Sequence, residues 1–522
     1  MELRTATVMS LLSFVGWLTS PIFWILRICN RKKLPPIEDD ILRVSATKLA
    51  YLIRNKKISS EEVIRTYIKR INQVNPIINA VVEDRFHEAI VEAKSVDKLL
   101  KETNLSEEEL SKTKPLLGVP LTVKESCCVK GLSASVGSLR YKGKKAEDDG
   151  VVVAKVREAG AIPLLVSNTP EMCMGWESSN NITGKSYNPY HPAHSTAGSS
   201  GGEAALVASG ASVIGMGSDL AGSIRLPAHF NGVFGHKPSP RVCSIKGHIP
   251  YSSHDSFVEM LSIGPFTRFA EDLYLMMKVM AQDPRILKLD EKVDFSRLRI
   301  YCHRRIGNNF FYVDVDTEII ALLEKTINHF REAHQAKFCA KEFKNFTKTM
   351  DMGLVLLPEA TSNVLSLLQD PKTGKKDLNA ILELVKSTFG MSVLTFSAAM
   401  SEALRVVHVV PKRKHSYYKK KKEELKAELS RELQNDGILF LPTFYTTALQ
   451  NGQATLKPKG YMYTMLFNLL GFPATHIPMG LSRNGLPIGI QVVAAPLQDR
   501  LCLAVATELE RLFNGWVEPG TL

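Results

Sequence analysis

The stretch STAGSSGGEAALVASGASVIGMGSDLAGSIRLP, from Ser195 to Pro227, decides the fold of this chain. It carries few charges and is rich in Gly, Ala and Ser, a composition typical of a tightly packed site where backbone approaches a ligand closely. Two hydroxyls, those of Ser199 and Ser200, lie between glycines, and Ser223 follows Ser199 by 24 residues. A Ser- and Gly-rich turn before a buried helix has the same composition. The serines therefore become catalytic candidates only if the sequence also supplies a general base as their partner.

Lys124 is the partner that the sequence offers upstream. It follows the apolar run LLGVPLTV, residues 116–123, which predicts a buried strand that ends at the lysine. Burial favours the neutral form of an amine, and a neutral amine beside a serine hydroxyl is a competent general base. A strand-end lysine that points into solvent is the alternative. The combination of Lys124 with Ser199 and Ser223 favours catalysis.

The segments around this stretch predict an α/β fold. A helix over residues 151–159 is followed by a second buried strand over 162–166, and strand, helix, strand with short glycine turns is typical of a parallel sheet covered by helices. Ser45 and Ser59 predict the starts of two early helices, the second ending at Asn75-Pro76. Further strands are predicted at 298–301, 438–441 and 488–493, and mainly amphipathic helix at 314–433.

The N-terminus contains 22 uncharged residues between Arg4 and Arg27, TATVMSLLSFVGWLTSPIFWIL. Such a run is long enough to cross a bilayer as a helix, although Pro21 and several hydroxyls weaken it. A surface-lying helix and a cleaved signal peptide are the alternatives. The basic residues after the run predict a single N-terminal anchor with the body in the cytosol, on an endomembrane or lipid droplet. We expect residues 1–35 to form this anchor with a basic, proline-containing linker, and 36–522 to form one domain.

Composition and charge limit the classes of partner. Hydrophobic residues make up 44% of the chain and charged residues 23%, which excludes disorder for most of its length. The net charge of +13 includes seven basic residues in KRKHSYYKKKK, residues 412–422, which favour a solvated helix face or a patch that faces acidic lipid. No nucleic-acid motif accompanies them, and the eight cysteines show no zinc-site spacing. We therefore predict no nucleic-acid partner, no cofactor and no metal.

The segment AGSSGGEAALVASGASVIGMGSDLAGSIRLPAHFNGVFGHKPS resembles the signature of the amidase signature family of serine hydrolases, and GVPLTVKES resembles the family's lysine strand. REAGAIPLLVSNTPE, GPFTRFAEDL and FNLLGFPATHIPMGLSRNGLPIGIQVVA resemble further blocks in the expected order. The resemblance runs from about residue 41 to the C-terminus. It implies a large, twisted, mixed and mostly parallel central sheet covered by helices on both faces. It further implies a signature core at about 115–270, a divergent helical substrate channel at about 314–433 and a C-terminal core at 434–522.

The resemblance also implies a Ser-Ser-Lys triad. In it Ser223 is the nucleophile, Ser199 relays the proton and follows a cis peptide bond, and Lys124 is the base. The backbone N–H groups of four residues would form the oxyanion hole, and four further residues would line or support the site. The oxyanion donors would be Leu220, Ala221, Gly222 and Ser223, with Ala221 in place of the usual glycine. Met174 would line the site through its backbone and Ser200 would brace the loop. Asp219 and Arg225 would form a structural ion pair.

The resulting hypothesis is a membrane-associated enzyme that hydrolyses hydrophobic, fatty-acid-like amides to a free acid and an amine through an acyl-enzyme. Two alternatives are the amidase component of a tRNA-dependent amidotransferase and an inactive membrane scaffold. Ser200 as the nucleophile of an α/β-hydrolase is disfavoured, because the residues before it, YNPYHPAHSTA, do not predict a strand. Acyl length, amine group and oligomeric state stay open, a homodimer included.

Overall fold

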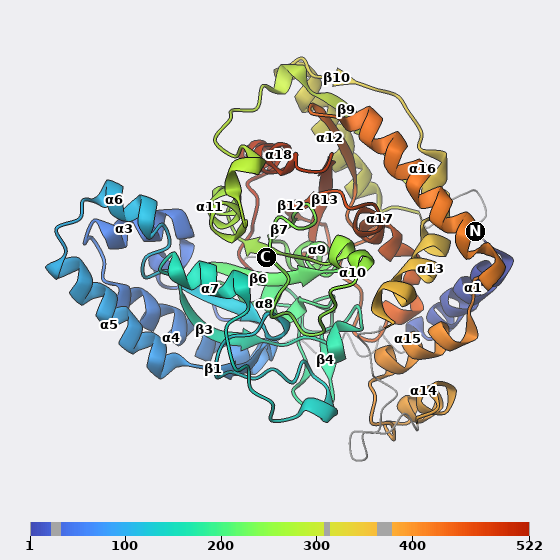
Figure 1. The fold of residues 1–522 in the computed structure, drawn as a ribbon, viewed down its shortest axis with the longest axis horizontal. Coiled ribbons are helices and arrows are strands. Elements are labelled where there is room, and N and C mark those ends of the chain that lie inside the picture. The colour runs from blue at the N-terminus through green and yellow to red at the C-terminus, as the bar shows by residue number, and fades with distance from the viewer. Residues whose placement is uncertain (1, 22–32, 307–313, 363–377, 521–522) are drawn as a thin grey trace.

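The computed structural model describes residues 2–21, 33–306, 314–362 and 378–520. Within these ranges the chain forms one 11-stranded sheet with helices packed around it (Figure 1). Its strands are β1 (Val81–Asp84), β2 (Pro120–Lys124), β3 (Ile162–Ser167), β6 (Ile214–Asp219), β7 (Phe234–Lys237), β8 (Ser262–Thr267), β9 (Arg299–Cys302), β10 (Lys337–Phe338), β11 (Gly437–Pro442), β12 (Ala474–Leu481) and β13 (Pro487–Ala494). β4 (Ser179–Asn180) and β5 (Gly184–Lys185) form a separate pair.

The strand order in the sheet is β1-β3-β2-β6-β8-β7-β12-β13-β11-β9-β10. Parallel pairings join β3, β2 and β6 towards one end and β11, β9 and β10 at the other. The remaining neighbours pair antiparallel. The predicted mixed sheet covered by helices is confirmed. Its antiparallel centre was not visible in the strand–helix–strand pattern, because that pattern covers only the segment around β2 and β3.

Helices alternate with the strands and gather at two sides of the molecule. Figure 1 shows α3–α6 at one side and α1, α13, α15 and α16 together at the other. The helices are α1 (Leu3–Leu18), α3 (Ala46–Arg54), α4 (Ser60–Ile78), α5 (Phe86–Glu102), α6 (Glu107–Thr113), α7 (Val151–Glu158), α8 (Gly201–Ala208), α9 (Arg225–Asn231), α10 (Asp255–Met260), α11 (Ala270–Met280), α12 (Thr317–Ala333), α13 (Thr349–Thr361), α14 (Ala380–Thr388), α15 (Phe396–Val407), α16 (His415–Leu433), α17 (Met462–Leu470) and α18 (Asp499–Phe513).

The charge-poor signature stretch is the centre of the fold. It forms α8, β6 and the start of α9, and residues 192–219 and 222–231 are buried without exception. Leu220 and Ala221, between these ranges, are only partly buried. The stretch is therefore core, except at the two residues that precede Gly222 and Ser223.

One N-terminal helix differs from its prediction, and the predicted membrane span is only partly within the described residues. α4 runs through Pro76 to Ile78 instead of ending at Asn75-Pro76, because the Asn75 side chain accepts the amides of Ala80 and Val81 and Asn79 adopts a left-handed cap. The predicted membrane span extends into residues 22–32, outside the described residues. In the described part of the chain, no helix combines the length and the apolarity needed to cross a bilayer.

Candidate active site

Lys124 lies at the end of β2 and is fully buried. Its Nζ forms hydrogen bonds with Ser199 Oγ at 2.6 Å and with Ser218 Oγ at 2.9 Å. The solvent-facing alternative for this lysine is therefore wrong. A buried amine in contact with two hydroxyls is positioned to exchange protons with either of them.

Ser199 lies on the turn that leads into α8, after a cis Gly198-Ser199 peptide bond, as the resemblance implied. The turn is too crowded for side chains at its glycines. A Cβ at Gly198 would lie 2.7 Å from the Gly175 carbonyl oxygen, and one at Gly201 would lie 2.3 Å from Thr196 Oγ1. The glycines therefore permit the close approach that brings Ser199 onto Lys124.

Ser223 lies at the wall of a pocket and is 8% exposed. Its carbonyl accepts the Ser200 amide at 3.2 Å, which joins the two serine loops. Ser200 itself is fully buried, and its hydroxyl donates to the Ser218 carbonyl at 3.2 Å, as a brace would. The structure thus brings Lys124 and Ser199 into contact and sets Ser223 beside Ser200. Proton transfer between Ser199 and Ser223 stays a prediction.

Asp219 and Arg225 form a fully buried ion pair at 3.1 Å. Burial alone would raise the pKa of the Asp219 carboxyl, but the Arg225 guanidinium and further hydrogen bonds lower it to about 2. The carboxylate also accepts the amides of Gly222, at 2.6 Å, and Ile224, at 3.1 Å. The pair therefore shapes the loop that carries Ser223, as a structural ion pair does.

The predicted oxyanion donors fall into two groups. The Gly222 N–H already points at Asp219, whereas the N–H groups of Leu220, Ala221 and Ser223 have no acceptor among the described residues. Gly222 has φ +114°, and a Cβ there would lie 2.1 Å from Thr464 Oγ1, so glycine is required. Ala221 is not in the left-handed region, so its methyl group is accommodated. These three residues line the pocket, and their role as oxyanion donors stays a prediction.

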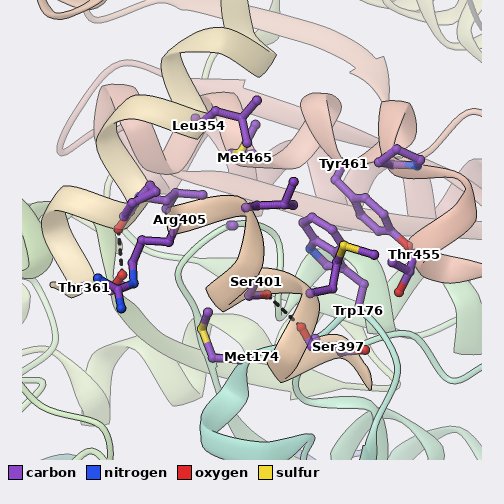
Figure 2. A pocket seen from close by; sticks show the side chains of 18 of the residues that line it. Met174, Trp176, Leu354, Thr361, Ser397, Ser401, Arg405, Thr455, Tyr461 and Met465 are labelled. Atoms are coloured by element: carbon purple, nitrogen blue, oxygen red, sulfur yellow. Dashed lines mark hydrogen bonds between the residues drawn. The ribbon is translucent and has the colours of Figure 1, made fainter. Parts of the chain in front are cut away.

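The pocket has a volume of about 200 Å³ and a largely apolar wall. Leu220, Ala221 and Ser223 lie in this wall, as does Met174. Figure 2 shows Trp176 and Tyr461 side by side, with their rings stacked at 3.8 Å. The predicted channel region contributes α13 and α15, and α1 contributes as well; their lining residues include Met9, Leu12, Met350, Leu354, Leu357, Ser397, Met400 and Arg405.

Ser218 and His248 are two site residues that sequence reasoning missed. Ser218 Oγ lies 2.9 Å from both Lys124 Nζ and His248 Nε2. His248 Nδ1 lies 2.7 Å from the Pro250 carbonyl oxygen, which can only accept, so Nδ1 carries a proton. A histidine without a nearby acidic residue in the sequence gives no signal, and only the fold brings His248 to the end of β6.

Cys173 also lines the pocket and was not singled out from the sequence. Burial by itself would raise the pKa of its thiol, but the charges of Lys124 and His248 lower that pKa to about 6. For Cys127, burial outweighs the Lys124 charge and raises the pKa to about 12, because His248 does not act on this thiol. Cys173 is therefore the thiol near Lys124 that ionises at neutral pH.

Alkylation by iodoacetamide is expected to modify Cys173 with a pH midpoint near 6, because the thiolate is the reactive form and exists above its pKa. In Lys124→Ala the midpoint should move upward, towards the ordinary value of about 8.5. Peptide mass spectrometry across a pH series measures both, and Cys173→Ser serves as the unlabelled control. A midpoint that Lys124→Ala leaves unchanged would contradict the assigned cause.

Comparison with known proteins identifies the family. A family model described as Amidase matches residues 62–503, so the chain belongs to the amidase family and is an amide-bond hydrolase. Fatty-acid amide hydrolase 2 of Homo sapiens is 40% identical over 499 residues, which cover 93% of this chain and 92% of that protein. Fatty-acid amide hydrolase 2-A of Danio rerio is 37% identical, with 97% of each chain covered. A glutamyl-tRNA(Gln) amidotransferase component of Syntrophus aciditrophicus is 26% identical, with 90% and 98% covered.

Solved structures show the same fold. A fatty acid amide hydrolase matches with a TM-score of 0.71 and 23% identity, covering 93% of this chain and 87% of its own. The 6-aminohexanoate cyclic dimer hydrolase matches with a TM-score of 0.73 and 23% identity, covering 92% and 99%. The family membership that the signature stretch implied is confirmed.

Proposed function

We propose that this enzyme hydrolyses amides of long-chain fatty acids, with Ser223 as nucleophile, Ser199 as proton relay and Lys124 as base. One observation carries the proposal: a buried lysine contacts Ser199 beneath an apolar pocket whose wall contains Ser223. The relatives named fatty-acid amide hydrolase 2, at 37–40% identity over nearly the whole chain, support the substrate class.

The reaction would proceed in two halves. Ser223 Oγ attacks the amide carbonyl while its proton passes through Ser199 to Lys124, and the N–H groups of Leu220, Ala221 and Ser223 stabilise the oxyanion. One such donor is typically worth about 10²–10³ in rate. An amine leaves only when protonated, so the Lys124 ammonium returns the proton through Ser199. Water then releases the fatty acid from Ser223 by the same route.

Ser218 and His248 would orient Lys124 for this task. His248 Nδ1 donates to the Pro250 carbonyl, which fixes the ring so that Nε2 contacts Ser218 Oγ. Ser218 Oγ in turn accepts an N–H of Lys124. This contact fixes the direction of the Lys124 amine so that Nζ also faces Ser199, where the relay needs it.

Membrane association is supported by exposed apolar side chains. On α1, Leu3, Trp17 and Leu18 are between 62% and 82% exposed, while Met9 and Leu12 of the same helix line the pocket. Phe389 and Met391, just after α14, are 72% and 69% exposed. We propose that these apolar side chains contact lipid, with residues 36–522 as one catalytic domain held on the cytosolic side. A lipid-soluble amide would then enter next to the bilayer.

The basic run is better explained as a helix face in water. Residues 412–414 form a short 3-10 helix and residues 415–422 begin α16, and several lysines of the run are paired with acidic side chains. Lys414 contacts Glu2 at 2.7 Å, and Lys419 contacts Glu359 at 2.6 Å. This pairing removes part of the charge that would otherwise attract acidic lipid.

A panel of primary amides of increasing chain length tests the proposed substrate class. We expect kcat/KM for oleamide to exceed that for butyramide by about 100-fold or more, because each buried methylene contributes roughly 0.8 kcal/mol. Steady-state assays in detergent micelles, with Ser223→Ala as the blank, measure the ratio. A preference for short polar amides would overturn the substrate class and leave the triad in place.

A further inference from the structure

Outside the pocket, two histidines and a glutamate converge on one point. His329 Nε2 and His334 Nε2 each lie 2.8 Å from the same oxygen, Glu508 Oε1. The corresponding ligand atoms of all three residues lie within 4.8 Å of one another. None of these three residues is among the described residues that line the pocket. The cluster is therefore separate from the site described above.

This arrangement matches the ligand set of a zinc-class ion. Zinc is bound by imidazole nitrogen and carboxylate oxygen at about 2.0–2.2 Å, so two ligand atoms around one tetrahedral ion lie roughly 3.3–3.5 Å apart. The two histidine–carboxylate separations of 2.8 Å need to widen only slightly to admit an ion, and the two imidazole nitrogens, within 4.8 Å of each other, would take the same spacing around it. The side chains are 13–24% exposed, so an ion could enter and keep water as a further ligand.

The imidazoles are held in place by their neighbours. Phe295 packs edge-on against the His334 ring at 4.8 Å, and Phe330 lies against both histidines at 5.5–5.6 Å. The nearby cation, Arg511, lies 3.7 Å from the other Glu508 oxygen and is 76% exposed, so it can move into solvent. Rings fixed by packing require little reorganisation to bind an ion.

We propose that His329, His334 and Glu508 form a binding site for a divalent transition-metal ion of the zinc class. His329 lies on α12, His334 directly follows that helix, and Glu508 lies on α18. Both helices pack against β13 (Figure 1). A bound ion would link α12 to the C-terminal helix and stabilise the molecule. The site gives no sequence signal, because more than 170 residues separate Glu508 from the histidines.

Zinc titration of the full-length, chelator-treated protein tests the site. Calorimetry should show one tight site per chain. His334→Gln and Glu508→Gln should each weaken that site about 10-fold or more, whereas His254→Gln, which removes an exposed histidine elsewhere, should leave it unchanged. Zinc should also raise Tm in the unsubstituted protein but not in the double variant His329→Gln/His334→Gln.

Cobalt substitution provides a readout that does not depend on the variants. Co²⁺ in a site with two imidazoles and a carboxylate should give the intense visible absorption of a four- or five-coordinate ion. Absorption like that of hydrated Co²⁺, or zinc affinity that the double variant retains, would overturn the proposal. Either result leaves the proposed hydrolase function untouched, since that function is measured separately on amides.

Discussion

Ser223→Ala is expected to lower kcat/KM for a fatty-acid amide by about 10⁴-fold or more, the scale on which hydrolases lose a nucleophile. Ser223 lies in the pocket wall, directly after the loop whose free amides would bind the oxyanion. The same variant should no longer react with a fluorophosphonate probe, which labels activated serines. Initial-rate assays and probe fluorescence on a gel measure the two effects.

Ser200→Ala is the matched control for this experiment. Ser200 is fully buried and its hydroxyl donates to the Ser218 carbonyl, so its loss is expected to cost about 1 kcal/mol of stability. Probe labelling should persist in this variant. Undiminished labelling of Ser223→Ala, together with its loss in Ser200→Ala, would instead make Ser200 the nucleophile.

Lys124→Ala is expected to reduce amide hydrolysis by about 10³-fold or more and to reduce hydrolysis of the matched methyl ester far less. An amine departs only after it receives a proton, which Lys124 supplies through Ser199, whereas an alkoxide needs that proton less. Measuring kcat/KM for oleamide and methyl oleate with the same preparation gives the ratio directly.

Lys237 offers a control for the loss of any buried lysine. It is fully buried, and its Nζ donates to the Pro238 carbonyl at 2.9 Å rather than to a site serine. Burial and the Arg225 charge lower its pKa to about 7, so it is a second buried amine that lies outside the proposed relay. Lys237→Met should change amide and ester rates by the same factor. Equal losses in Lys124→Ala would argue against the relay.

The sequence predicted those parts of the site that lie within continuous segments. Lys124 follows an apolar strand, and the glycines around Ser199 are required by the 2.3–2.7 Å approaches described above, so both left a local pattern. Ser218 left none because its contact with Lys124 depends on the pairing of β6 with β2, and His248 and Cys173 left none because only the fold brings their segments to this site. For the same reason the antiparallel centre of the sheet was missed: its pairings depend on packing between segments that carry no shared pattern.

The end of helix α4 also differs from its prediction. Pro76 was expected to stop its helix, but a proline near a helix end removes few hydrogen bonds, and Asn75 satisfies the backbone amides beyond it. At Gly222, by contrast, the residue type predicted the local structure correctly. Gly222 has a positive φ and no room for a side chain, so the residue type and the structure agree.

Because α1 forms part of the pocket wall, removing it would change the shape of the proposed substrate site. One face of this helix contributes Met9 and Leu12 to the pocket wall, Glu2 at its start is held by Lys414 and Tyr418, and a Cβ on Gly16 would lie 3.1 Å from Leu456. Trimming the apolar N-terminus to ease purification would therefore remove part of the cavity lining. A shortened form would be a different catalyst, with chain-length selectivity that need not reflect that of the intact enzyme.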